Sequence, residues 1–150
     1  MSSVVGLLLK GGVANFLHSL RDYVERRSLA ARFPPGVFLW GARSRSSLYV
    51  EGVKVLLYLS KSEYGPGGVV LFGTLERPVE LRERYWPEGE WPILLPIRVV
   101  KFARGVLENP DNPRAWKLVT REILAQLGLK VLPGPQKIDD KVVEEIVKLM

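Results

Sequence analysis

Two apolar runs joined by a glycine-rich segment constrain the fold of this 150-residue chain more than any other feature. Residues 53–59, VKVLLYL, and residues 69–76, VVLFGTLE, are rich in β-branched and large apolar side chains. Strand formers on either side of the GPGG segment at 65–68 predict a β-hairpin. This segment is not followed by Lys-Ser or Lys-Thr, so we interpret it as a turn and not as a phosphate-binding loop. Gly73 within the second run predicts a bulge or a close backbone approach.

Three further apolar runs extend the predicted sheet. Residues 4–9 are apolar throughout, as a central strand would be, and residues 37–40 form a short strand that ends at Trp40. Residues 93–102 predict a longer strand, in which Pro96 marks an edge or a bulge. The hairpin and the clustered strands together favour a largely antiparallel or mixed sheet.

Three segments have the spacing or the end signals of helices. Asn15 is a candidate N-cap for residues 16–27, and either Asp139 or Asp140 for residues 141–150. Asn112 and Pro113 predict the start of a helix that runs to residue 127 and ends at Gly128, with Trp116 on its buried face. The expected order is strand, helix, four strands and two helices, which is an α+β fold with helices flanking the sheet. We expect one domain covering residues 1–150.

The residue types that are scarce exclude several kinds of chemistry. The chain has no cysteine and a single histidine, His18, so thiolate sites and a Ser-His-Asp triad are not expected. We interpret Glu88 and Glu90 as solvated loop charges. We therefore predict a protein that is not an enzyme and has no metal or cofactor. No apolar run approaches the ~20 residues of a membrane helix, and we expect a cytoplasmic protein. Few Asn and Gln residues with many Pro, Arg and Glu are typical of a thermophile.

The positive charge is concentrated in the first third of the chain. The net charge is +6, and residues 1–45 hold seven cations and two anions, which leaves only +1 for the remaining residues. A one-sided basic excess favours a polyanionic partner, most often nucleic acid.

Aromatic residues stand at strand ends and in irregular segments, where planar groups can stack on them. Trp40 precedes the basic segment GARSRSS, and Tyr64, Tyr85, Trp86 and Trp91 lie in predicted loops. Aromatic faces at loop mouths are typical of base-binding surfaces. The alternative for Trp86 and Trp91 is that they pin a long loop to the sheet.

The order of these segments resembles the EVE domains, which belong to the PUA-like fold with the YTH and ASCH domains. The resemblance rests on VFLWGA at 37–42, VKVLLYLSK at 53–61, GGVVLFGTLE at 67–76 and WPILLPIRVVKF at 91–102. The C-terminal region, with a Trp-bearing segment, an LP pair and a closing helix, is similar as well. Val53 stands where these domains usually have an acid, and the loop after Trp40 is short.

The resemblance implies a β-barrel-like sheet with a pocket that takes a modified nucleobase in DNA or RNA. Combined with the loop aromatics, it predicts a base-binding pocket made of Trp40, Gly41, Ala42, Ser44, Tyr58, Trp86 and Trp91. The arginines near this pocket are the predicted phosphate ligands: Arg26, Arg27, Arg43 and Arg45.

Three functions follow from this reading. The first is a non-enzymatic binder of a modified base, for which Trp40→Ala would abolish binding and leave stability nearly intact. The second is a general RNA-binding PUA-like module. The third is an ASCH-type nuclease or amidohydrolase, for which the polar candidates are Lys54, Lys61, Thr74 and Glu76.

Overall fold

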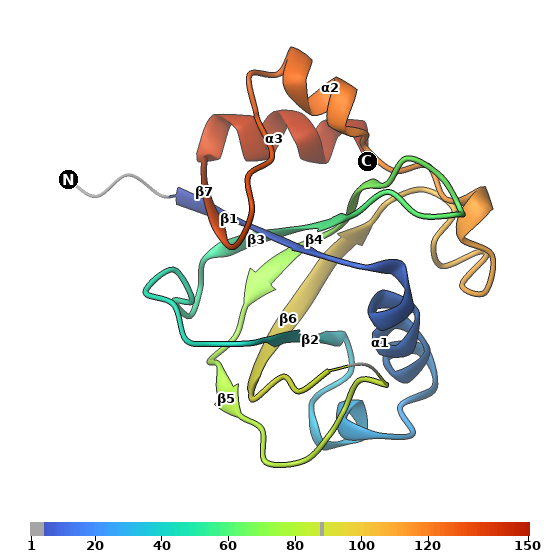
Figure 1. Ribbon diagram of the computed structural model, residues 1–150, viewed down its shortest axis with the longest axis vertical. Helices are drawn as coiled ribbons and strands as arrows, with labels where there is room; N and C mark the ends of the chain where they lie inside the picture. Colours follow the sequence, from blue (N-terminus) through green and yellow to red (C-terminus); the bar gives the residue numbers. More distant parts are fainter. Residues whose placement is uncertain (1–4, 88) are drawn as a thin grey trace.

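Within residues 5–87 and 89–150, which the computed structural model describes, seven β-strands form one mixed sheet (Figure 1). Their spatial order is β2-β6-β4-β3-β1-β7, and β5 pairs with β6 beside this path. The strands are β1 Val5–Gly11, β2 Val37–Ala42, β3 Lys54–Leu59, β4 Gly68–Leu75, β5 Val79–Glu80, β6 Ile93–Phe102 and β7 Gln136–Asp139. The helices are α1 Val13–Glu25, α2 Arg121–Gln126 and α3 Asp140–Leu149, with 3-10 turns at Leu29–Arg32 and Pro113–Ala115.

The predicted hairpin is confirmed. Strands β3 and β4 are antiparallel neighbours, and Leu56 lies opposite Phe72. Gly73 lies at a register shift between β4 and β6, and a Cβ atom on it would come within 2.4 Å of the Arg98 carbonyl oxygen. Both expectations for this glycine are therefore confirmed, because the bulge and the close backbone approach occur together.

The apolar run at the start of the chain forms an interior strand, as predicted. Strand β1 pairs in parallel with β3 and antiparallel with β7, so the sheet is mixed. Leu7, Leu8 and Leu9 are all buried, because α3 packs on one face of β1 and the core lies on the other. Figure 1 shows α2 and α3 above β1 and β3, and α1 on the other side of these strands, beside β2 and β6.

The sheet is open, so the predicted α+β fold with a mixed sheet and flanking helices is confirmed, but its barrel-like shape is not. The strand order runs from β2 to β7, and these two strands do not pair. The sheet nevertheless curls, which brings β1 and β2 close together. A Cβ atom on Gly11 of β1 would lie 2.2 Å from Cζ2 of Trp40 on β2. Helix α1 packs against β2, and Phe16 lies among the buried residues that fill the curl. Strands β1 and β2 are therefore connected across the curl by side-chain packing and not by backbone hydrogen bonds.

The predicted helix over residues 113–127 is wrong over its first half. After the 3-10 turn, Lys117 N–H donates to the Arg104 carbonyl, and Val119 and Val69 exchange both backbone hydrogen bonds. This segment pairs with the ends of other strands, and that pairing overrides its helical spacing. The helix α2 begins only after Thr120, whose hydroxyl accepts from the backbone N–H of Ile123.

Other end signals have mixed outcomes. Asp139 caps α3 by accepting from Lys141 N–H at 3.0 Å, as predicted. Helix α1 begins at Val13, so Asn15 lies inside the helix and is not its cap. Pro96 was predicted to mark an edge or a bulge, but β6 is interior and its register shift with β4 lies between Val99 and Lys101, so neither is found at Pro96. The Pro96 carbonyl accepts from Glu76 N–H just beyond the last β4–β6 pair, so the N–H that proline lacks falls where this ladder ends.

None of the helices within the described residues is long and apolar enough to span a bilayer.

The contacts of Gly73 make it a sensitive test of the sheet. Gly73→Ala is expected to lower the free energy of unfolding by about 1–3 kcal/mol, because the added methyl meets backbone and cannot be relieved by a side-chain rotation. Urea denaturation measures this loss. Gly12→Ser is the control, since nothing lies within 4 Å of its added Cβ and its φ is −94°. Equal stabilities for the two variants would contradict the close approach at Gly73.

Candidate functional site

Three tryptophans predicted as walls of a base pocket lie together, but they contact one another directly. The ring centroids of Trp40 and Trp86 are 4.5 Å apart, and those of Trp86 and Trp91 are 5.0 Å apart. Both pairs are edge-to-face, a favourable packing of aromatic rings. Trp40 is 3% exposed and Trp86 is 2% exposed. The rings occupy the space in which a stacked base would have to lie.

Gly41, next to Trp40, leaves the space in which Trp86 and Trp91 pack. A Cβ atom on Gly41 would lie 2.9 Å from Cβ of Trp91 and 3.0 Å from Cζ3 of Trp86. Gly41 is thus the residue that lets the loop approach β2. Ala42 is buried beside it, and Ser44 is exposed on the following turn.

The loop that carries Trp86 is attached to α1 by two side-chain hydrogen bonds. The indole Nε1–H of Trp86 donates to Oγ of Ser19 at 2.8 Å, and the Tyr85 hydroxyl donates to Oδ2 of Asp22 at 2.6 Å. His18 packs edge-on against the Tyr85 ring, with centroids 4.7 Å apart. These contacts correspond to the alternative interpretation, in which Trp86 pins a long loop to the body of the protein.

Asp22 is a buried carboxylate at the centre of this attachment. It is 5% exposed, and it also accepts from the backbone N–H groups of Ser28 at 2.8 Å and Ala30 at 2.9 Å. Burial and the hydrogen bond to Asp22 raise the pKa of Tyr85, so the phenol remains protonated and continues to donate. Three donors compensate the carboxylate for its lost hydration.

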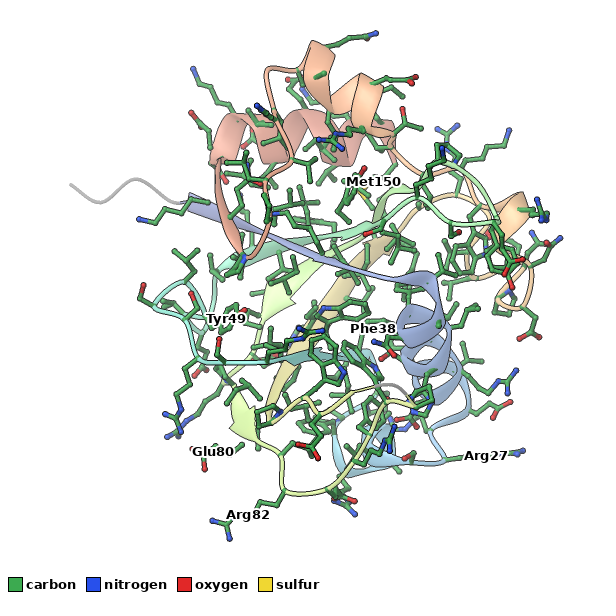
Figure 2. All side chains as sticks on the ribbon, in the orientation of Figure 1. Arg27, Phe38, Tyr49, Glu80, Arg82 and Met150 are labelled. Atoms are coloured by element: carbon green, nitrogen blue, oxygen red, sulfur yellow. The ribbon has the colours of Figure 1, made fainter. Side chains whose placement is uncertain are left out.

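The four predicted phosphate ligands are not brought together. Arg26 ends α1 with φ +54°, and its Nη2 donates to the Phe33 carbonyl at 2.7 Å, which is a structural role. Arg27 extends away from the body of the protein (Figure 2). Arg45 pairs with Glu80, and the Arg43 guanidinium lies 4.9 Å from the Trp91 ring centroid. The short loop after Trp40 therefore uses one of its arginines in an ion pair and the other in a cation–π contact.

Tyr58 is separated from the tryptophans and lines a different cavity, of about 730 Å³. The cavity lies where β1 and β3 end, and α2 and the 131–134 segment form its other sides. Its lining consists of Lys10, Tyr58, Ser60, Lys61, Pro66, Thr120, Arg121, Glu122, Ala125, Val131, Leu132, Pro133 and Gly134. By comparison, the cavity beside Trp91 has a volume of about 320 Å³.

The parallel pairing of β1 with β3 places Lys10 directly beside Tyr58. The Lys10 ammonium donates to Oε1 of Gln136 at 3.0 Å and to the Gly134 carbonyl. Burial lowers the pKa of Lys10 to about 8. Sequence reasoning missed this residue, although a lone lysine at the end of an apolar strand, followed by two glycines, was a usable signal.

The charged residues that line this cavity are predominantly cationic. Lys61 and Arg121 are exposed at its rim and Lys10 is half-buried, whereas Glu122 is the one carboxylate among the lining residues. Val131 and Leu132 add apolar surface, and Leu132 is 46% exposed. The cavity therefore combines positive charge, hydroxyl groups and apolar contacts, which suits an anion with an attached planar or apolar group.

The polar residues considered for an enzyme do not converge. Lys54 and Thr74 are cross-strand partners, but Lys54 pairs with Asp140 and Glu76 with Arg98. Lys61 lies beyond the opposite end of β3. Among residues 5–87 and 89–150, no three His, Asp or Glu side chains lie close enough to hold a metal ion.

Comparisons with known proteins identify the fold alone. No protein-family model matches the chain, and no curated protein matches it either. The structure resembles that of a hypothetical protein from Leishmania major, with a TM-score of 0.58 and 14% identity over 98% of this chain and 94% of the other. It also resembles an X-ray structure of a Pseudomonas syringae protein, with a TM-score of 0.54 and 14% identity over 95% and 97% of the two chains.

The burial of Trp40 reverses the expectation for its substitution. Trp40→Ala is expected to lower the free energy of unfolding by about 3–5 kcal/mol, because it removes a ring packed against Phe16, Phe38 and Trp86. Urea denaturation followed by circular dichroism measures the loss. Trp91→Ala is the control and should be less destabilising, because its ring is only half-buried. A Trp40→Ala protein as stable as the wild type would show that Trp40 is not a core residue.

Proposed function

We propose that this protein is a non-enzymatic nucleic-acid-binding domain of the PUA-like type, which takes a nucleobase in the cavity lined by Lys10 and Tyr58. One observation carries the proposal: three cationic side chains, a tyrosine and the apolar residues Val131 and Leu132 line one cavity, and its lining includes a single carboxylate. The volume of about 730 Å³ is within the range of small-molecule sites. The order of motifs that resembles the EVE domains supports the same class of ligand.

The cavity offers separate partners for each part of a nucleotide. Lys61 and Arg121 at the rim suit the phosphate, because cations dominate the affinity of proteins for nucleic-acid backbones. The Lys10 ammonium has a third N–H beyond those given to Gln136 and Gly134, and the Thr120 hydroxyl, which accepts in the cap of α2, still has its O–H; both can read a base edge. Val131 and Leu132 are apolar partners for a methyl group, which is why we favour a methylated base as the ligand. The tryptophan cluster supports the fold next to α1 and is not the base site.

A general RNA-binding module is the second candidate, and the rim charges by themselves suit it equally. The two differ in one measurable property. A modified-base reader binds a strand with one N6-methyladenine or 5-methylcytosine more tightly than the unmodified strand at every salt concentration. A general module binds both strands equally, with an affinity set by phosphate contacts.

The rim cations provide the direct test. Lys61→Ala combined with Arg121→Ala is expected to weaken binding of a single-stranded oligonucleotide and to reduce the slope of log K against log salt by about 1.4, or about 0.7 per lost phosphate contact. Fluorescence anisotropy across a salt series gives both quantities.

Lys141→Ala combined with Lys148→Ala is the matched control for this experiment. It removes two exposed cations as well, but both are on α3 and outside the cavity lining. A loss of the same size in both double variants would place the binding site elsewhere.

Lys10 makes binding pH-dependent. Its folded-state pKa of about 8 means that the ammonium is present below pH 8 and is lost above it, so affinity should fall as pH rises through about 8. An oligonucleotide of adenine and cytosine alone avoids titration of the bases in this range. The Lys10→Met variant should lack this step, and an equally large step in Lys10→Met would assign it to another group.

As pH rises, the contribution of Lys10 to the stability of the free protein should increase, whereas the affinity for the oligonucleotide should fall. The pKa of Lys10 is lower in the folded chain than the ordinary value of 10.5, so between about pH 8 and 10.5 the unfolded chain binds more protons. The contribution of Lys10 to stability therefore rises with pH across this window. Comparing denaturation of the wild type and Lys10→Met at pH 7.5 and pH 10 measures that contribution, and an unchanged difference between them would contradict it.

A further inference from the structure

A second cavity, of about 210 Å³, adjoins the first. Pro66 and Thr120 line both cavities, so these two residues form a ridge between them. Beyond the ridge, the second cavity is lined by the glycine-rich turn on one side and by the segment around the second 3-10 turn on the other. Its characteristic residues are Ser62, Tyr64, Arg114, Trp116 and Lys117.

Tyr64 enters this second cavity from a turn whose backbone is held by hydrogen bonds. Ser62 and Gly65 exchange backbone hydrogen bonds, and Tyr64 N–H donates to Oγ of Ser62 at 3.1 Å. Gly67 has φ +79°, and a Cβ atom on it would lie 2.2 Å from the Leu59 carbonyl oxygen, so the turn packs closely on the end of β3. The backbone at Tyr64 is thus held by the turn itself, which limits the entropy lost when a ligand binds.

A cation already lies over the ring of Tyr64. The Arg114 guanidinium carbon is 5.5 Å from the ring centroid, and Arg114 itself is exposed. Trp116 lines the bottom of this cavity and is 7% exposed. Its polar Nε1–H donates to the Asn109 carbonyl at 2.7 Å, so the rest of the ring offers an apolar surface. A half-buried tyrosine next to a planar guanidinium is a platform on which any base can stack.

The charges of the two cavities are continuous. The second cavity adds Arg114 and Lys117 to the three cations of the first, and its lining includes no carboxylate. Glu122 is therefore the one acidic residue among all the residues that line the two cavities. Charge complementarity points to one polyanionic occupant that crosses the ridge.

We propose that the second cavity is a subsite for the neighbouring nucleotide of a single strand. The base of that nucleotide stacks on Tyr64 and Arg114, and the phosphate that links it to the nucleotide in the first cavity crosses the ridge at Pro66 and Thr120. The occupant is single-stranded, because bases in a duplex are stacked on one another and cannot enter two cavities on opposite sides of a ridge. This inference rests on the proposed function of the first cavity.

The test compares ligands of increasing length. Adenine-and-cytosine oligonucleotides of one, two and four nucleotides, each with a fluorescent label, are titrated with the wild type and with Tyr64→Ala. We expect the wild type to bind the dinucleotide more tightly than the mononucleotide by roughly 5- to 150-fold, the range of one base–aromatic contact. Tyr64→Ala should lose this gain and bind the mononucleotide as the wild type does.

Two further variants keep the result interpretable. Tyr49→Ala removes another half-buried tyrosine that lies outside both cavities, and it should leave the gain unchanged. Tyr64→Leu keeps apolar packing in the turn but removes the aromatic face, so it should lose the gain even if Tyr64→Ala is unstable. Thermal melting of each variant confirms that it is folded.

Each contrary outcome has a distinct meaning. Equal affinity of the wild type for one and two nucleotides, or an unchanged gain in a folded Tyr64→Leu protein, overturns the second subsite and leaves the proposed function standing. No binding of any oligonucleotide overturns the proposed function and the subsite together. A hexaglutamate peptide that competes as well as an oligonucleotide of similar charge overturns the assignment to nucleic acid, because it shows a site for polyanions in general.

Discussion

The parallel pairing of β1 with β3 is the constraint on which the rest of the structure depends. It makes the first apolar run an interior strand, buried on both faces, and it places Lys10 next to Tyr58 where the two strands end. Parallel neighbours require a long connection, and here that connection includes α1, which lies in the curl of the sheet. The candidate cavity, the position of the first helix and the burial of Trp40 beside Gly11 all follow from this one register.

The aromatic residues divide into two groups with different physical roles. The rings of Trp40, Trp86 and Trp91 are packed edge to face and close the space between β2 and the loop that Asp22 and Ser19 hold to α1. Their stacking surfaces are used within the protein. Tyr58 and Tyr64 lie instead in the linings of two adjoining cavities rich in cations. Aromatic residues in loops therefore mark both a structural cluster and a candidate ligand surface in the same chain.

Much of the secondary structure could be predicted because local signals and tertiary pairing agree. The hairpin, the bulge at Gly73 and the Asp139 cap are examples in which residue chemistry permits few alternatives. Prediction failed where long-range pairing overruled a local pattern. Residues 117–119 have helical spacing, but their backbone groups pair with Arg104 and Val69. Likewise, Trp40 was predicted to line a pocket because a basic segment follows it, whereas its spatial neighbours are Phe16, Phe38 and Trp86.

The sequence by itself determined an α+β chain with a central hairpin, a concentrated basic excess and no cysteine chemistry, because composition and short-range periodicity are properties of the chain alone. Only the tertiary structure decided which cations and aromatic rings meet. Lys10 and Tyr58 are 48 residues apart, and Tyr64 and Arg114 are 50 apart, so each pair exists only through strand register and loop packing. Bringing such distant residues together costs chain entropy, and the burial of the whole core offsets that cost. Core burial depends on all strands and helices at once, so a local sequence pattern does not reveal it.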